Sequence, residues 1–175
     1  FMLGLKRGTV KLTQSSDAFK KLFVQEKQYI LENLELDVLD LEHIGSTAIQ
    51  GIQCKPIIDM VLGIPSLDSK TSKPYIIQLE KIGYTYMHDF TDRLFFVKGG
   101  ESKRTHHLNL VVFESQEQWT DKINFRDYLN HQPAIAKEYS QLKSKLALSY
   151  PNNRKLYTQA KSQFIEDVLS SKSVK

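Results

Sequence analysis

The chain has 175 residues, of which 41% are hydrophobic and 25% are charged, and its formal net charge is +4. That length suffices for one domain with a sizeable core. No segment resembles a signal peptide or approaches the roughly 20 apolar residues of a membrane span, so we expect no membrane partner. One cysteine, Cys54, cannot form an internal disulfide, which favours a cytoplasmic location. We expect Met2 to be the natural start and Phe1 to be a remnant of expression.

The N-terminal part of the chain alternates between helical and strand patterns. Ser15 or Ser16 can cap a helix that continues to about Asn33, because apolar residues recur there at the helical period. Apolar runs bounded by glycine, proline and polar turns predict the other elements. In chain order these are a strand over 38–44, a strand over 56–64, a helix from Pro74 to Gly83, a hairpin of strands 84–88 and 93–98, and a strand over 105–113.

The C-terminal part carries helical patterns throughout. Ser115 and Gln118 predict a capping box for a first helix, and Pro133 opens a second. A third helix starts at Asn152 or Asn153, with an apolar stripe of Leu156, Ala160, Phe164 and Val168. These patterns predict an α/β (α+β) fold, in which helices flank a mixed β-sheet and a helical cap follows. We expect one domain over 2–175, with a sheet-containing core over 2–114 and a cap over 115–175.

The segment HIGSTAIQGIQCKPIID, from His43 to Asp59, carries the clearest chemical signal. A strand ends at Gly45-Ser46, and a lone carboxylate, Asp59, lies near the start of the next apolar strand. Nucleotidyl-transfer sites are assembled in this way, because a small turn lets backbone N–H groups approach a phosphate while the acid holds a metal. Ser46 can equally cap a short helix. Asp59 can equally pair with a basic side chain, because an unpaired buried carboxylate is costly.

A metal site at Asp59 needs further ligands. Val61 stands where a second carboxylate on the same strand face is needed, so we expect catalysis to be weak or to use an unusual metal site. On the strand RTHHLNLV, alternation places His107 and Asn109 on one face, as candidate ligands for Mg²⁺ or Mn²⁺ beside Asp59. His107 is also a candidate acid/base residue or an ordinary sheet histidine, and His43 has the same ambiguity.

Basic residues near these elements are candidate phosphate ligands. Lys55, in the loop before Asp59, is the strongest candidate, and Arg93 and Arg104 lie close to flanking elements. From residue 134 onward eight Lys/Arg accompany three Asp/Glu, which indicates either solvated helix faces or a basic wall for an anionic ligand. We expect no nucleic-acid partner, because nucleic-acid binding demands a denser basic patch. Cys54 has no visible base beside it and is a poor candidate nucleophile.

Five segments together carry a family resemblance: HIGSTAIQGIQCKPIID, RTHHLNLV, FRDYL, EYSQLK and YTQAKSQFI. Their order and content resemble the GrpB family, whose members carry a close relative of HIGSTAVPGLAAKPIID and belong to the nucleotidyltransferase-like superfamily. The resemblance covers almost the whole chain and implies a nucleotidyltransferase-like sheet. It adds Arg126, Tyr157 and Lys161 as candidate ligand-binding residues. Asn109 departs from the family pattern, which has a second histidine at that position.

Three functional hypotheses follow. The first is a protein that binds a nucleotide or other phosphorylated small molecule and transfers a nucleotidyl group, with Mg²⁺ or Mn²⁺ on Asp59. The second is a non-catalytic binder of a nucleotide or acidic metabolite in the same cleft. The third is an acid/base enzyme that uses His107 with Asp59. The sequence leaves the substrate and the oligomeric state open.

Overall fold

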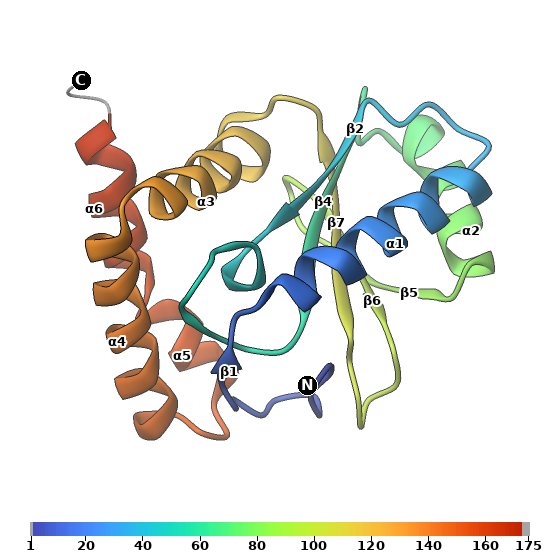
Figure 1. The fold of residues 1–175 in the computed structure, drawn as a ribbon. Helices are drawn as coiled ribbons and strands as arrows, with labels where there is room; N and C mark the ends of the chain where they lie inside the picture. The colour runs from blue at the N-terminus through green and yellow to red at the C-terminus, as the bar shows by residue number, and fades with distance from the viewer. Residues whose placement is uncertain (1, 173–175) are drawn as a thin grey trace.

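The computed structural model describes residues 2–172, so the predicted remnant Phe1 and residues 173–175 lie outside the described part. Within 2–172, five strands form one mixed sheet in the order β2-β4-β7-β6-β5 (Figure 1). Strands β4 and β7 are parallel, and the other neighbours are antiparallel. The strands are β2 (Asp40–Ile44), β4 (Ile58–Ile64), β5 (Tyr84–Asp89), β6 (Leu94–Lys98) and β7 (His106–Val112). The predicted mixed sheet is confirmed.

The central strand β4 separates two cores by simple alternation. Ile58, Met60 and Leu62 point into the main core, where they meet apolar side chains of the helices on that face. Val61 points to the opposite face and packs in a smaller cluster with Trp119. Asp59 shares this second face, because it lies two residues before Val61 on the same strand. The polar site is therefore built on the face opposite the main core.

Helices α1 (Asp17–Asn33) and α2 (Ser69–Lys81) cover the main-core face. Helix α1 has the predicted bounds, with Ser16 at its N-cap. The predicted start of α2 is wrong, because the helix begins at Ser69 and Pro74 lies inside it. The side chain of Asp68 accepts a hydrogen bond from the backbone N–H of Thr71 and so fixes the earlier start. Gly83 follows the helix with a φ of 94°, as the predicted stop requires.

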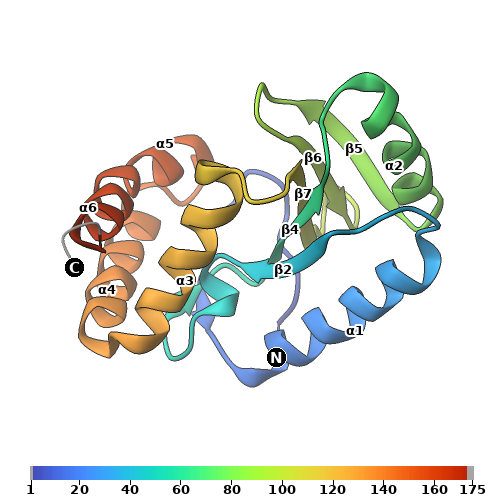
Figure 2. The same ribbon diagram turned by 90° about the horizontal axis from the view of Figure 1, so that it is seen from above.

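The C-terminal helices gather on one side of the molecule, away from α1 and α2, as the orange to red ribbon shows in Figures 1 and 2. They are α3 (Asp121–His131), α4 (Pro133–Ser149), α5 (Arg154–Gln159) and α6 (Ser162–Lys172). A core of its own joins α3, α4 and α6 to Ile49 and Ile52, in the connection between β2 and β4. We call α3–α6 the cap. The boundary between 114 and 115 remains a prediction.

Two local predictions in the cap are wrong. Ser115 makes no side-chain cap, and the Gln118 side chain donates to Asp92 of the β5–β6 hairpin instead of completing a capping box. A π-helical turn, η2 (Gln116–Thr120), precedes α3. The single predicted third helix is broken between α5 and α6. Asn153 caps α5 as expected, but the break moves the buried position from Leu156 to Tyr157.

Three short elements complete the fold, of which the sequence patterns missed the two strands. Strands β1 (Thr13–Gln14) and β3 (Gln53–Cys54) pair in a small antiparallel sheet, and η1 (Ser46–Ala48) is a single 3₁₀ turn after β2. The turn η1 and strand β3 lie in the connection between β2 and β4, and β1 lies before α1. Among the described helices, none is both long enough and apolar enough to cross a membrane.

Candidate functional site

Asp59 and His107 form the centre of the polar face. They are register partners on the parallel strands β4 and β7, and His107 Nδ1 lies 2.9 Å from Asp59 Oδ1. Burial opposes the ionisation of Asp59, but the hydrogen bond from His107 and the charges of nearby cations outweigh it and lower the pKa of Asp59 to about 2. Burial lowers the pKa of His107, which Asp59 only partly offsets. At neutral pH the pair is therefore a carboxylate that accepts a hydrogen bond from a neutral imidazole.

The glycine of the Gly-Ser turn is required by Asp59. Gly45 has a φ of 71°, and a Cβ placed on it would lie 2.8 Å from Asp59 Oδ2. Only a glycine both adopts this backbone conformation without strain and leaves room for the carboxylate. Gly45, and not Ser46, occupies the N-cap position of the turn η1, and Ser46 is its first residue.

A cleft of about 610 Å³ opens between this face of the sheet and the cap. That volume lies in the range of small-molecule sites. Its walls bring together these predicted residues: Gly45, Ser46, Lys55, Asp59, His107, Asn109 and Lys161. Their roles as ligands remain predictions, but their convergence from the turn, two strands and the cap gives a candidate site at one place in the molecule.

Four cations line this cleft from separate elements: Lys55, Lys122, Arg154 and Lys161. Burial is the main cause that lowers the pKa of Lys55 to about 8 and of Lys161 to about 7, and repulsion from neighbouring cations adds to it. Asp59 acts in the opposite direction on both. Within residues 2–172, none of the four cations forms an ion pair. The lining also includes the carboxylates Glu117, Asp121 and Glu166, so cations and carboxylates are equal in number, but among the described residues none of these carboxylates forms an ion pair with the four cations.

Lys122 and Arg154 were missed by the sequence analysis. Arg154 belongs to the basic C-terminal region. Two residues of this region, Arg154 and Lys161, line the cleft, whereas Lys155 is exposed outside it. Some of these basic residues therefore lie on a cleft wall and others on a solvated helix face, and whether the wall binds an anion stays a prediction. Lys122 lies in the first turn of α3, and no motif distinguishes it. Only the tertiary placement of the cap brings these two cations to Asp59.

Arg93 and Arg104 do not line the cleft. Arg93 pairs with Asp92 at 3.0 Å and lies 3.9 Å from the ring of Phe90, at the tip of the β5–β6 hairpin. Arg104 is 3% exposed, and its guanidinium donates to Glu101 at 2.7 Å. Both guanidinium groups therefore have structural partners, and their placement does not support a direct phosphate contact.

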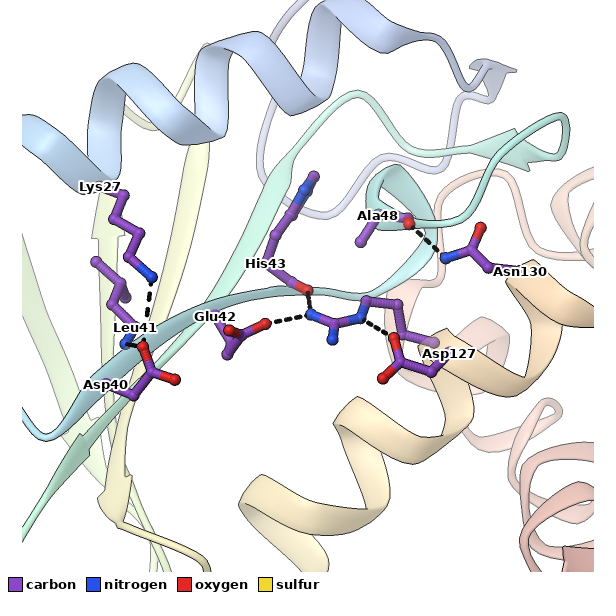
Figure 3. Close-up of polar contacts among 9 residues, drawn as sticks. Lys27, Asp40, Leu41, Glu42, His43, Ala48, Asp127 and Asn130 are labelled. Carbon is purple, nitrogen blue, oxygen red and sulfur yellow. Dashed lines mark hydrogen bonds and ion pairs between the residues drawn. The ribbon is translucent and has the colours of Figure 1, made fainter.

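Arg126 also lies outside the cleft, where it ties the cap to the edge strand β2. Its guanidinium donates to Glu42, to the backbone carbonyl of His43 at 2.7 Å and to Asp127 at 2.7 Å. Figure 3 shows these acceptors, together with the bond from Asn130 to the carbonyl of Ala48 at 3.1 Å. Arg126 thus satisfies a backbone carbonyl of the edge strand β2, and Asn130 satisfies one of the turn η1 that follows it. This arrangement explains Arg126 without a ligand.

Three further candidates are interior residues. Tyr157 is 1% exposed, and Lys161 Nζ lies 4.5 Å and Lys55 Nζ 5.9 Å from the centroid of its ring. Tyr157 therefore makes cation–π contacts with both lysines. His43 faces the main core, where it stacks on Phe23 and bonds the Thr47 hydroxyl, and burial lowers its pKa to about 4. Burial raises the pKa of Cys54 to about 11, which opposes a nucleophilic role.

The donors around Asp59 do not fit a two-metal centre. Val61 is fully buried beneath Trp119, so the position of a second carboxylate is closed. Asn109 offers an amide, and its Nδ2 lies 3.5 Å from the carbonyl of Met60. In the described part of the chain, no three His, Cys, Asp or Glu side chains are grouped to hold a metal ion. Two divalent ions need two or three carboxylates, and this face provides one.

Comparison with solved structures defines the class of fold. The chain superposes on a crystal structure of the Cid1 poly(U) polymerase bound to MgGTP with a TM-score of 0.53 and 12% sequence identity, over 78% of this chain and 44% of that one. A second Cid1 structure, bound to Mg 3′-dATP, gives a TM-score of 0.54 at 10% identity, over 85% and 49%. At this identity the likeness concerns the fold alone, which is that of the nucleotidyltransferases.

The family follows from closer relatives. The family model described as GrpB protein matches residues 9–171, so the chain belongs to the GrpB family. It is 37% identical to the Glutamate-rich protein GrpB of Alkalihalophilus pseudofirmus over 97% of this chain and 99% of the relative. The crystal structure of the conserved protein GrpB from Enterococcus faecalis superposes with a TM-score of 0.81 at 31% identity, over 92% of this chain and 96% of that one.

Proposed function

We propose that this chain binds a nucleotide or a related phosphorylated small molecule in the cleft between the sheet and the cap. One observation carries the proposal: Lys55, Lys122, Arg154 and Lys161 reach the same cleft from separate elements, and no ion pair neutralises them within residues 2–172. Phosphate oxygens are strong acceptors that can pair directly with these unpaired cations. A phosphorylated ligand therefore satisfies these cations better than a neutral metabolite does.

The fold supports the same assignment. The Cid1 structures of comparable fold were solved with nucleotides and Mg²⁺, although the low identity transfers no residue role to this chain. Apolar and aromatic side chains such as Phe125 and Tyr139 also line the cleft. A ligand with both a planar apolar part and phosphates, as nucleotides have, matches this mixed lining.

A thermal-shift assay with a panel of phosphorylated compounds tests the proposal. The panel contains nucleoside mono-, di- and triphosphates, sugar phosphates and pyrophosphate, each with its unphosphorylated counterpart. A ligand present at about 100 times its Kd stabilises the fold by about 2.7 kcal/mol, which raises Tm by several degrees. We expect phosphorylated members to raise Tm and their counterparts to leave it unchanged. A panel without any shift contradicts the proposal.

A second candidate function rests on His107 Nε2. This atom is buried and has no hydrogen-bond partner among the described residues, while Nδ1 is held by Asp59. A neutral imidazole held in this way can accept the proton of an attacking hydroxyl or water through Nε2, and Asp59 then stabilises the imidazolium. We propose this as the catalytic alternative to simple binding. Phosphate release from ATP tests it, because His107→Gln should then abolish turnover and leave ATP binding intact.

A further inference from the structure

The charge of Asp59 is already shared among several cations. It favours the protonated forms of Lys55, Lys161 and Arg154, which approach it from the loop before β4 and from the C-terminal helices of the cap. His107 donates a hydrogen bond to Oδ1 of the same carboxylate. A divalent cation placed on Asp59 meets the repulsion of these side chains, and one carboxylate offers little to offset it.

Other carboxylates of the cleft do not converge on Asp59. Glu117 and Asp121 come from η2 and the start of α3, and Glu166 comes from α6. Glu117 and Glu166 are exposed, and Asp121 accepts a hydrogen bond from Gln116. These three residues and Asp59 form no group that could hold a metal ion, as assessed over residues 2–172. Around Asp59, the cleft therefore offers a metal ion a single carboxylate, whereas it offers an anion several cationic side chains.

The lysines lack the anion that their position calls for. Burial lowers the pKa values of Lys55, Lys122 and Lys161, and repulsion from other cations adds to it, from Arg154 on Lys55 and from Arg93 on Lys122. A polyanion that enters the cleft offsets both penalties together. Each ammonium then replaces a contact that a metal ion would make with the phosphates.

We infer that the cleft takes its polyphosphate ligand free of bound metal, with Lys55, Arg154 and Lys161 in the role that Mg²⁺ has around a nucleotide. The inference rests on the proposed function and narrows it to a ligand with at least two adjacent phosphates. It also reverses the expected role of Asp59, which becomes a negative charge that limits affinity and orients the lysines. Mg²⁺ then competes with the protein for the phosphates.

Titration calorimetry with inorganic tripolyphosphate and with ATP tests this inference, in EDTA and again in excess Mg²⁺. We expect binding in EDTA and weaker binding in Mg²⁺ for both probes. Asp59→Asn should bind both probes at least as tightly as the unchanged protein, since an amide keeps the shape and removes the opposing charge. Lys161→Gln should weaken binding about tenfold, the loss of one charged hydrogen bond.

Lys155→Gln is the matched control, because Lys155 is exposed on α5 and lies outside the cleft. It should leave both affinities unchanged, and circular dichroism should show every variant folded. Binding that requires Mg²⁺, or that Asp59→Asn abolishes in a folded protein, overturns the metal-free inference and leaves the proposed function standing. No binding of either probe in either buffer overturns the metal-free inference, and it overturns the proposed function as well if no member of the thermal-shift panel raises Tm. Equal losses in Lys155→Gln and Lys161→Gln mean adventitious surface binding and overturn both.

Discussion

Gly45 and Asp59 occupy adjoining space, so that a single methyl group on Gly45 would lie 2.8 Å from Asp59 Oδ2. The turn after β2 and the carboxylate on β4 are thus fitted to each other across the edge of the sheet. This contact explains in steric terms why a glycine is needed at the start of the Gly-Ser turn. It also keeps the carboxylate against His107 and within reach of the cleft lysines.

Gly45→Ala should destabilise the protein more than Gly51→Ala. The two glycines have nearly equal φ values, 71° and 70°, but a Cβ on Gly51 meets no atom within 4 Å. The strain of a left-handed backbone costs about 1 kcal/mol in either variant. The clash with Asp59 should raise the cost for Gly45→Ala to about 2–3 kcal/mol. Urea unfolding measures both, and equal costs would mean that the carboxylate simply moves aside.

Arg126→Ala should lower stability and leave ligand affinity unchanged. The change removes the donor of Glu42, Asp127 and the His43 carbonyl, which leaves partly buried acceptors unpaired and costs roughly 1–3 kcal/mol. Lys161→Gln should show the opposite pattern, with weaker binding and unchanged or higher stability, because it removes a poorly solvated charge. Urea melts and calorimetry on the two variants separate the roles. A loss of affinity in folded Arg126→Ala would restore its predicted role as a phosphate ligand.

Val61→Asp should unfold or strongly destabilise the protein and should not create a metal site. Val61 lies on the same strand face as Asp59, but it is fully buried against Trp119, Ile44 and Val111. An unpaired carboxylate there costs several kcal/mol, whereas the control Val61→Ala costs about 2 kcal/mol through a cavity. Thermal unfolding with and without Mn²⁺ distinguishes the outcomes. A stable Val61→Asp variant that Mn²⁺ stabilises further would show that the cluster opens to the cleft.

Lys143 should make stability depend on alkaline pH. It is fully buried on α4, donates to the backbone carbonyl of Gln53, and its pKa is lowered to about 7, mainly by burial. The unfolded chain binds this proton up to about pH 10.5, so the folded protein gains stability as pH rises between about 7 and 10, by at most about 1.4 kcal/mol per pH unit. Lys143→Met should remove this part of the gain. If the free energy of unfolding has the same pH slope in the unchanged protein and in Lys143→Met, Lys143 is well solvated and the account is wrong.

The sequence predicted those parts of the site that depend on local periodicity. Alternation along β7 correctly placed His107 and Asn109 on one face, because the side-chain direction in a strand follows from residue number alone. The sequence does not show that β4 and β7 are neighbours. The structure shows it, because their parallel pairing joins Asp59 and His107, which lie 48 positions apart.

The remaining parts depend on tertiary placement, which local patterns do not encode. Lys122 and Arg154 resemble ordinary surface cations until the cap folds over the sheet, and Arg126 resembles a phosphate ligand until β2 supplies its acceptors. The start of α2 was predicted too late, at Pro74, because the cap at Asp68 outweighs the preference of proline for the first turn. The break between α5 and α6 has no proline or glycine to signal it.

A crystal structure of the protein soaked with tripolyphosphate in EDTA tests the central claim most directly. We predict phosphate oxygens within hydrogen-bond distance of Lys55, Arg154 and Lys161, beside the Asp59–His107 pair and without a metal ion between them. Lys122 should contact the phosphate nearest to η2. Density for the ligand against Arg93, Arg104 or Arg126, or on exposed lysines while the cleft holds only water, would contradict the account.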